Sequence, residues 1–191
     1  AFIVLEDGDV DLAAEELIWG RMYNTGQVCC ASKRFLIHES LAEAFTEKAV
    51  AKIKALRQGM PSDENTQIGC LISEKAAIEV EKQIQLTVRQ GGEIVLGGGR
   101  EGAFIEPTVI RNVPKTADVA TDMEIFGPVV PVITFKTTEE AIEIANSSRF
   151  GLCGCVFTEN MKKAMYVCNA LECGGTVING ASFFRSFEMP F

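Results

Sequence analysis

The stretch Val129-Val-Pro-Val-Ile-Thr-Phe135 decides the fold, because it opens a regular alternation of apolar strands and amphipathic helices. Thr137-Thr-Glu-Glu140 has the composition of a helix start, and the helix it predicts runs to about Asn146. A strand over 152–158, a helix over 161–171 and a strand over 176–179 follow in turn. Near-continuous apolar strands separated by helices are typical of a parallel sheet with right-handed crossovers. We therefore predict an α/β fold with three α/β/α layers and a mostly parallel sheet.

Further helices are predicted upstream of this stretch. Ser40-Leu-Ala-Glu43 has the spacing of a capping box, and apolar residues recur at helical intervals behind it up to Gly59. A second helix is expected to begin near Ser73 and to end at Gly91-Gly92, where a left-handed residue costs little. Glu93-Ile-Val-Leu96 then predicts a strand.

A glycine-rich segment follows this strand. Gly97-Gly-Gly99-Arg-Glu-Gly102 matches the G-x-G-x-x-G pattern of dinucleotide-binding turns. That pattern needs a helix directly behind it, whereas Ala103-Phe-Ile-Glu-Pro-Thr108 continues as loop and strand. We therefore predict a hairpin turn.

Composition and charge exclude several classes of protein. The 191 residues, 47% of them hydrophobic, suit one folded domain over 1–191 without linker or repeat. The net charge of -8 argues against a nucleic-acid partner, which would need clustered Lys and Arg. No apolar run approaches the roughly 18 residues of a membrane span, so no membrane association is expected.

Cysteine usage indicates a reducing compartment. The chain has seven cysteines, an odd number without the spacing of a disulfide framework, and we expect a cytoplasmic protein. Cys29-Cys30, Cys153-x-Cys155 and Cys168-x4-Cys173 do not form paired C-x2-C knuckles, and His38 is the only histidine. No metal site is therefore predicted.

The most informative junction lies between a helix-like segment, Leu12 to Tyr23, and a predicted strand, Phe35-Leu-Ile-His38. It contains Asn24-Thr-Gly-Gln-Val-Cys29. A nucleophilic thiol must be reachable and must lie near free backbone N–H groups, and a turn after a glycine can provide both. A free cysteine is more often a small buried hydrophobe, so the residues alone leave both interpretations of Cys29 open.

Two motifs decide between these interpretations. Asn24-Thr-Gly-Gln-Val-Cys29 closely resembles the Gly-Gln-x-Cys signature of the aldehyde dehydrogenases, and Glu124-Ile-Phe-Gly-Pro-Val129 resembles their Glu-x-Phe-Gly-Pro signature. Phe2–Asp11, Glu106–Val109, Phe150–Leu152 and Val156–Thr158 look like the same family in the same order.

The resemblance implies a role for each matching residue. Cys29 would attack the aldehyde carbon to form a thiohemiacetal, hydride would pass to NAD or NADP, and the resulting thioester would be hydrolysed. The Cys29 N–H would form half of the oxyanion hole. Glu124 would accept hydrogen bonds from the nicotinamide ribose, and Phe126 would pack near the nicotinamide ring. Cys30 would line the pocket or be inert.

The substrate is expected to be a small aldehyde. Leu171-Glu-Cys-Gly-Gly175 and Ile178-Asn-Gly180 look most like bacterial succinate-semialdehyde dehydrogenases. Arg185, in a segment that resembles the substrate-anchoring loop, could pair with a substrate carboxylate. Tyr23 occupies the substrate-binding place six residues before the nucleophile, where many of those enzymes carry an arginine.

Parts of a complete family member are expected to be absent from this chain. These are the N-terminal cofactor domain, a general-base Glu, an oxyanion-hole Asn and a C-terminal oligomerisation strand. We expect the isolated chain to be inactive and the full-length enzyme to be a homo-oligomer. A non-catalytic domain that kept the fold, or a fatty-acyl or phosphorylating relative, remains an alternative. A Cys–His peptidase would need His38, for which a surface position is the stronger expectation.

Overall fold

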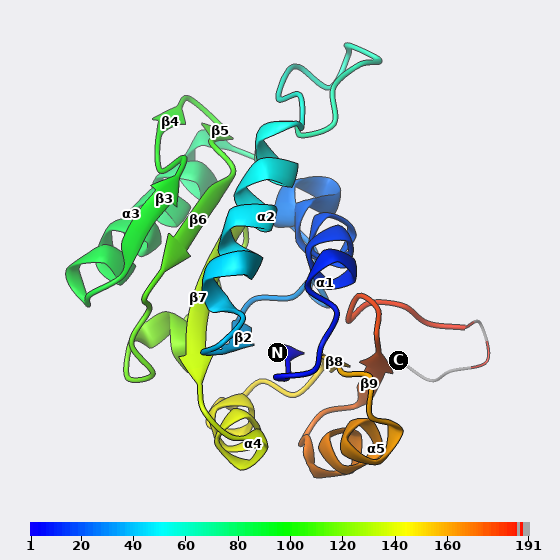
Figure 1. The fold of residues 1–191 in the computed structure, drawn as a ribbon. Helices are drawn as coiled ribbons and strands as arrows, with labels where there is room; N and C mark the ends of the chain where they lie inside the picture. The colour runs from blue at the N-terminus through cyan, green and yellow to red at the C-terminus, as the bar shows by residue number, and fades with distance from the viewer. Residues whose placement is uncertain (187, 189–191) are drawn as a thin grey trace.

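The computed structural model describes residues 1–186 and residue 188. In this part of the chain the central sheet has seven strands in the order β3-β6-β7-β2-β1-β8-β9 (Figure 1). All neighbouring strands in it are parallel except β3 and β6. The strands are β1 (Phe2–Val4), β2 (Phe35–His38), β3 (Glu93–Leu96), β6 (Thr108–Arg111), β7 (Val129–Phe135), β8 (Cys153–Phe157) and β9 (Gly175–Ile178).

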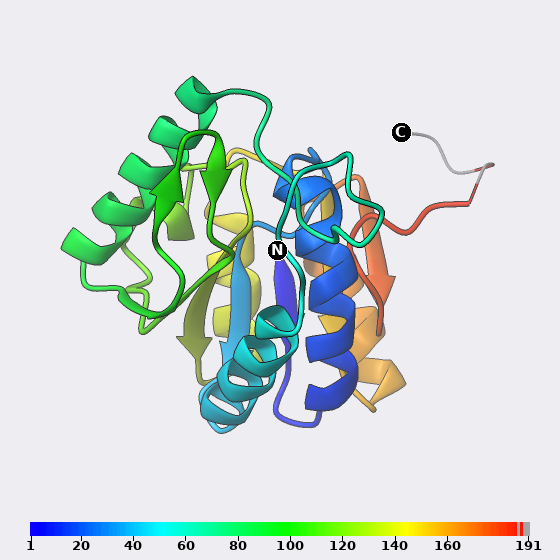
Figure 2. The same ribbon diagram turned by 90° about the horizontal axis from the view of Figure 1, so that it is seen from above.

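Helices cover both faces of the sheet, as Figures 1 and 2 show. One face carries α1 (Val10–Leu17) and α2 (Ala42–Lys54), and the other carries α3 (Glu74–Arg89), α4 (Thr138–Asn146) and α5 (Met161–Ala170). Each face has its own apolar core, because alternate strand residues point to opposite sides. The predicted three-layer fold with a mostly parallel sheet is confirmed.

Several predicted elements are found at their expected places. Strand β7 has the predicted bounds, and the Thr137 side chain accepts from the Glu140 N–H at the start of α4. Ser73 caps α3 in the same way, through the Ala76 N–H. The glycine-rich segment leads into a hairpin of β4 (Arg100–Glu101) and β5 (Phe104–Ile105), as predicted.

The helix predicted from Ser40 to Gly59 differs at both ends. The capping box is wrong, because α2 begins at Ala42 and no side chain caps it. The Ser40 hydroxyl instead lies 2.8 Å from Nδ1 of His38, a local contact that competes with capping. The helix ends at Lys54, before the predicted end at Gly59, and Gln58 instead forms an isolated parallel β-bridge with Ile68.

The helix predicted from Leu12 to Tyr23 is also divided. Its regular part, α1, ends at Leu17, and Ile18–Met22 widen into a π-helical turn. Tyr23–Gly26 then form a short 3-10 turn that leads toward Cys29. Single π turns inside helices are frequent at functional sites, and this one ends directly before the first motif.

Within residues 1–186 and 188, no helix has both the length and the apolar character needed to span a bilayer.

Candidate active site

An unusual backbone turn carries the first motif. Asn24, Thr25 and Gly26 all have positive φ angles, of 49°, 58° and 75°. Such conformations cost energy for residues with a side chain, so surrounding contacts must hold them. The Thr25 hydroxyl accepts from the Gly69 N–H at 3.2 Å, and the Gln27 amide oxygen accepts from the Ile72 N–H at 2.8 Å. The segment before α3 therefore fixes the chain leading to Cys29.

Cys29 is the exposed residue of the following turn. The Ala31 N–H donates to the Val28 carbonyl at 3.2 Å, which leaves Cys29 and Cys30 as the two central residues. The Cys29 side chain is exposed, and its backbone N–H has no hydrogen-bond partner in the described part of the chain. A reachable thiol next to a free amide is the arrangement expected of a nucleophile with an oxyanion hole.

Cys30 is placed differently from its neighbour. Its side chain is partly buried, and its carbonyl accepts a hydrogen bond from the Ser182 hydroxyl at 2.9 Å. Burial, and then the charge of Cys29, raise the pKa of the Cys30 thiol. A thiol with a raised pKa is a poor nucleophile at neutral pH, in keeping with the pocket-lining role expected of Cys30.

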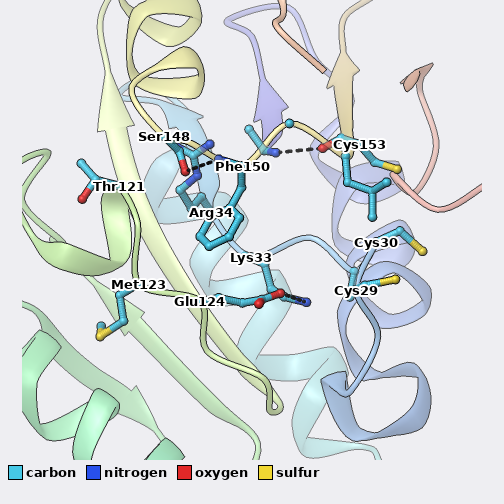
Figure 3. Close-up of a pocket in the computed structure, with 14 residues that line it drawn as sticks. Cys29, Cys30, Lys33, Arg34, Thr121, Met123, Glu124, Ser148, Phe150 and Cys153 are labelled. Carbon is cyan, nitrogen blue, oxygen red and sulfur yellow. Dashed lines mark hydrogen bonds and ion pairs between the residues drawn. The ribbon is translucent and has the colours of Figure 1, made fainter. Parts of the chain in front are cut away.

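A cavity of about 240 Å³ opens beside this turn (Figure 3). Side chains from both motifs line it, and so does the segment before β8. The lining residues are Ala1, Cys29, Cys30, Ala31, Lys33, Arg34, Thr121, Met123, Glu124, Ser148, Phe150, Gly151, Leu152 and Cys153. Cys29 and Glu124, expected from separate motifs, therefore share one cavity.

The cavity lies at the amino ends of the parallel strands. Lys33 and Arg34 precede β2, Glu124 precedes β7 and Leu152 precedes β8. Ligands of open α/β sheets usually bind at the carboxyl ends instead. In this fold the loops that enter the strands, not those that leave them, carry the candidate chemistry.

Lys33 links the two motifs, and the sequence did not single it out. Its Nζ lies 3.4 Å from Glu124 Oε1 and 4.7 Å from the centre of the Phe126 ring. It also donates to the Val28 carbonyl at 2.5 Å. Figure 3 shows the Lys33 and Glu124 side chains pointing toward each other. Burial, and then the nearby Arg21, lower the pKa of Lys33 to about 8, although Glu124 acts in the opposite direction.

Two buried arginines hold the walls of the site, and neither was predicted. Arg21, in the π turn, donates from Nε to the Val129 carbonyl at 2.7 Å and from Nη2 to the Ile125 carbonyl at 2.8 Å. These bonds fix the Glu-x-Phe-Gly-Pro segment against the chain before Cys29. An arginine on an otherwise apolar helical segment was the one sequence feature that could have revealed it.

The second buried arginine is Arg34. It donates to the Ile144 and Ala145 carbonyls in the last turn of α4, at 2.8 and 2.7 Å. The Ile144 carbonyl also accepts from Ser147. Arg34 also donates to the Ala120 carbonyl at 3.1 Å. Arg34 thus joins the end of α4 to the cavity wall.

The two predicted substrate residues lie outside this cavity. Tyr23 is half exposed, and its ring lies 4.9 Å from Trp19 and 5.9 Å from Phe183, centre to centre. It lines a separate groove between α1 and α2. Arg185 lies closer, because its Nη2 is 3.3 Å from Sγ of Cys153, which lines the cavity itself.

His38 is remote from the thiol. It is the last residue of β2, at the carboxyl ends of the parallel strands. Its ring nitrogens contact Ser40 and the Lys136 carbonyl. Cys29 lies near the amino ends of the same strands, so the two residues do not form a Cys–His pair. No group of three or more His, Cys, Asp or Glu side chains among the described residues is arranged to hold a metal ion.

The comparison with known proteins agrees with both motifs. The model of the aldehyde dehydrogenase family matches residues 1–191, and the chain belongs to this family. A lactaldehyde dehydrogenase of Methanococcus maripaludis is 41% identical over 189 residues, covering 99% of this chain and 40% of that protein. A succinate semialdehyde dehydrogenase [NAD(P)+] of Escherichia coli is 42% identical over 182 residues, covering 94% of this chain and 39% of that protein.

A solved structure matches the whole fold. It is a glyceraldehyde-3-phosphate dehydrogenase of Methanocaldococcus jannaschii complexed with NADP, 40% identical with a TM-score of 0.95. The match covers 100% of this chain and 41% of that one. The chain thus spans about 40% of the length of the curated relatives it matches.

Proposed function

We propose that residues 1–191 are the thiol-bearing catalytic domain of an NAD(P)-dependent aldehyde dehydrogenase, with Cys29 as the nucleophile. The observation that carries this proposal is the exposed Cys29 thiol, next to a backbone N–H without a partner in the described chain. The same cavity contains Glu124 from the second motif. A non-catalytic domain would not need an accessible thiol and a free amide at one turn.

The chemistry at Cys29 follows from this geometry. The thiolate attacks the aldehyde carbon, and the carbonyl oxygen gains negative charge within reach of the Cys29 N–H. The product of this step is a thiohemiacetal on Cys29. Its oxidation leaves a thioester, which water cleaves to the carboxylic acid and the free thiol.

The residues of the second motif suit a nicotinamide cofactor. NAD or NADP, when bound, supplies the hydride acceptor. The Glu124 carboxylate is about two-fifths exposed and can accept two hydrogen bonds from a ribose diol. Phe126 is 41% exposed, so that its side chain can offer an apolar surface to the nicotinamide. The NADP complex of the structurally similar dehydrogenase supports this role.

Succinate semialdehyde is the first candidate substrate. The Escherichia coli relative named for it is 42% identical to this chain, and Arg185 lies just outside the cavity, with its Nη2 3.3 Å from Sγ of Cys153, which lines it. A guanidinium there could pair with the distal carboxylate of the substrate. Lactaldehyde is the second candidate, because several relatives of similar identity carry that name.

The isolated 191 residues are proposed to be inactive. Glu124 is the one carboxylate among the described residues that line the cavity, and it is paired with Lys33. No second carboxylate is therefore placed there to activate the hydrolytic water. The family resemblance further suggests a homo-oligomeric enzyme, and the seven cysteines suggest a cytoplasmic one.

The proposal is tested with the full-length gene product, by following NAD(P)H formation from succinate semialdehyde and from lactaldehyde. Cys29→Ala should lower turnover by about 1,000-fold or more, whereas Cys30→Ala should leave it within about threefold because Cys30 is not a nucleophile. Iodoacetamide should also alkylate Cys29 faster than the other cysteines. Full activity of the Cys29→Ala variant would refute the assignment.

A further inference from the structure

The Lys33 side chain lies where the two motifs meet. Only 16% of it is exposed, so its position is fixed by packing as well as by charge. Its ammonium contacts the Val28 carbonyl, the Glu124 carboxylate and the Phe126 ring at once. Val28 directly precedes Cys29, so one cation joins the turn of the nucleophile to both residues of the second motif.

Among the described residues, only Lys33 holds the Glu124 side chain through a polar contact. Gln83 of α3 donates to the backbone carbonyl of Glu124 at 3.1 Å and so fixes the main chain. In the described part of the chain, the Glu124 carboxylate has no polar partner except Lys33. Without the ammonium, this carboxylate would be free to turn into solvent.

We propose that Lys33 is a positioning residue, which holds the Glu124 carboxylate and the Phe126 ring ready to receive the nicotinamide ribose beside Cys29. The inference rests on the proposed function, because it assigns a task within the same site. Lys33 acts through Glu124 and Phe126 and takes no part in bond making.

The charged groups around Lys33 support this role. Glu124 favours the protonated amine, and Cys29 does so to a smaller extent, whereas Arg21 and burial oppose it. With a pKa of about 8, Lys33 loses its charge in mildly alkaline solution and releases Glu124. Nucleotide affinity should therefore fall as the pH rises through about 8. An arginine at this position would keep its charge.

The first test measures the dissociation constants of NAD⁺ and NADP⁺ for the full-length gene product without aldehyde. Lys33→Met keeps the length of the buried stem but removes the charge, and it should weaken binding about tenfold at pH 7. Lys33→Arg should restore most of the affinity and abolish its decline above pH 8. Lys48→Met, which breaks an exposed ion pair with Asp11 between α1 and α2, is the matched control and should change nothing.

A double-mutant comparison shows whether Lys33 acts through Glu124. In the Glu124→Gln background, Lys33→Met should weaken binding much less than it does in the wild type, because only the contact of Lys33 with Phe126 remains to be lost. Additive losses, or unchanged affinity in Lys33→Met, would overturn the role of Lys33 while wild-type turnover remains. Absence of turnover in the wild type would instead count against the proposed function itself.

Discussion

Gly26 packs against Gly127 so closely that a β-carbon at Gly26 would lie 2.3 Å from the Gly127 carbonyl oxygen. One glycine belongs to the motif before Cys29, and the other belongs to the motif after Glu124. The two motifs thus pack directly against each other through these glycines. This contact places the thiol and the carboxylate on the same cavity.

The first prediction concerns this contact. Gly26→Ala should lower the free energy of unfolding well beyond the roughly 1–2 kcal/mol that a left-handed alanine costs by itself, because the methyl group would collide with Gly127. Gly102→Ala is the matched control, since Gly102 also has a positive φ but has no atom within 4 Å of its added β-carbon. Urea unfolding of the full-length gene product compares the two, and equal losses would contradict the close packing.

The second prediction is a pH dependence of stability. Because burial lowers the pKa of Lys33 from 10.5 to about 8, the folded state binds fewer protons than the unfolded state between these values. The titration of Lys33 should therefore raise the free energy of unfolding as the pH rises across this window, by an amount on the order of 1–3 kcal/mol. Urea unfolding at pH 7.5 and about 10 should show this rise in the wild type relative to Lys33→Met. Parallel pH profiles of the two proteins would exclude it.

The third prediction concerns Arg34 at the end of α4. Arg34→Met should cost about 2–3 kcal/mol of unfolding free energy, because the buried carbonyls of Ala145 and Ala120 would lose their donor. Arg89→Met, at an exposed position in the last turn of α3, should stay within about 0.5 kcal/mol of the wild type. Denaturant titrations of both variants decide the matter, and a small effect at Arg34 would mean that other donors replace it.

The fourth prediction concerns substrate selection. Arg185→Ala should raise the KM for succinate semialdehyde about tenfold or more, and that for an uncharged aldehyde of similar length should change little. Steady-state kinetics with both substrates provide the measurement. Equal increases for the two aldehydes would show that Arg185 does not bind the carboxylate.

Local sequence predicted the elements whose causes are local. Strand β7 and the capped start of α4 are found as expected, because apolar continuity and the Thr137 cap act within a few residues. The π turn after Leu17 was missed because distant contacts help to hold it there. The Gly20 carbonyl accepts from the Ser32 N–H at 3.0 Å, and Ala181 packs against Gly20.

The site was predictable to a similar extent. Family motifs indicated Cys29 and Glu124, and the structure brings both to one cavity. Lys33 carries no motif of its own, and its importance depends on a pairing with Glu124 that only the folded chain creates. Tyr23 lies outside that cavity, where its ring packs with Trp19 and Phe183, and its contact with substrate stays a prediction.

The position of the cavity at the amino ends of the strands has a practical consequence. The opposite rim, where the chain turns at Glu39–Ser40 and at Lys136–Thr137, is exposed and distant from Cys29. A fluorophore or a surface tether attached at that rim would leave the thiol facing outward. Surface-immobilised and single-molecule measurements could thus be designed without covering the Cys29 thiol.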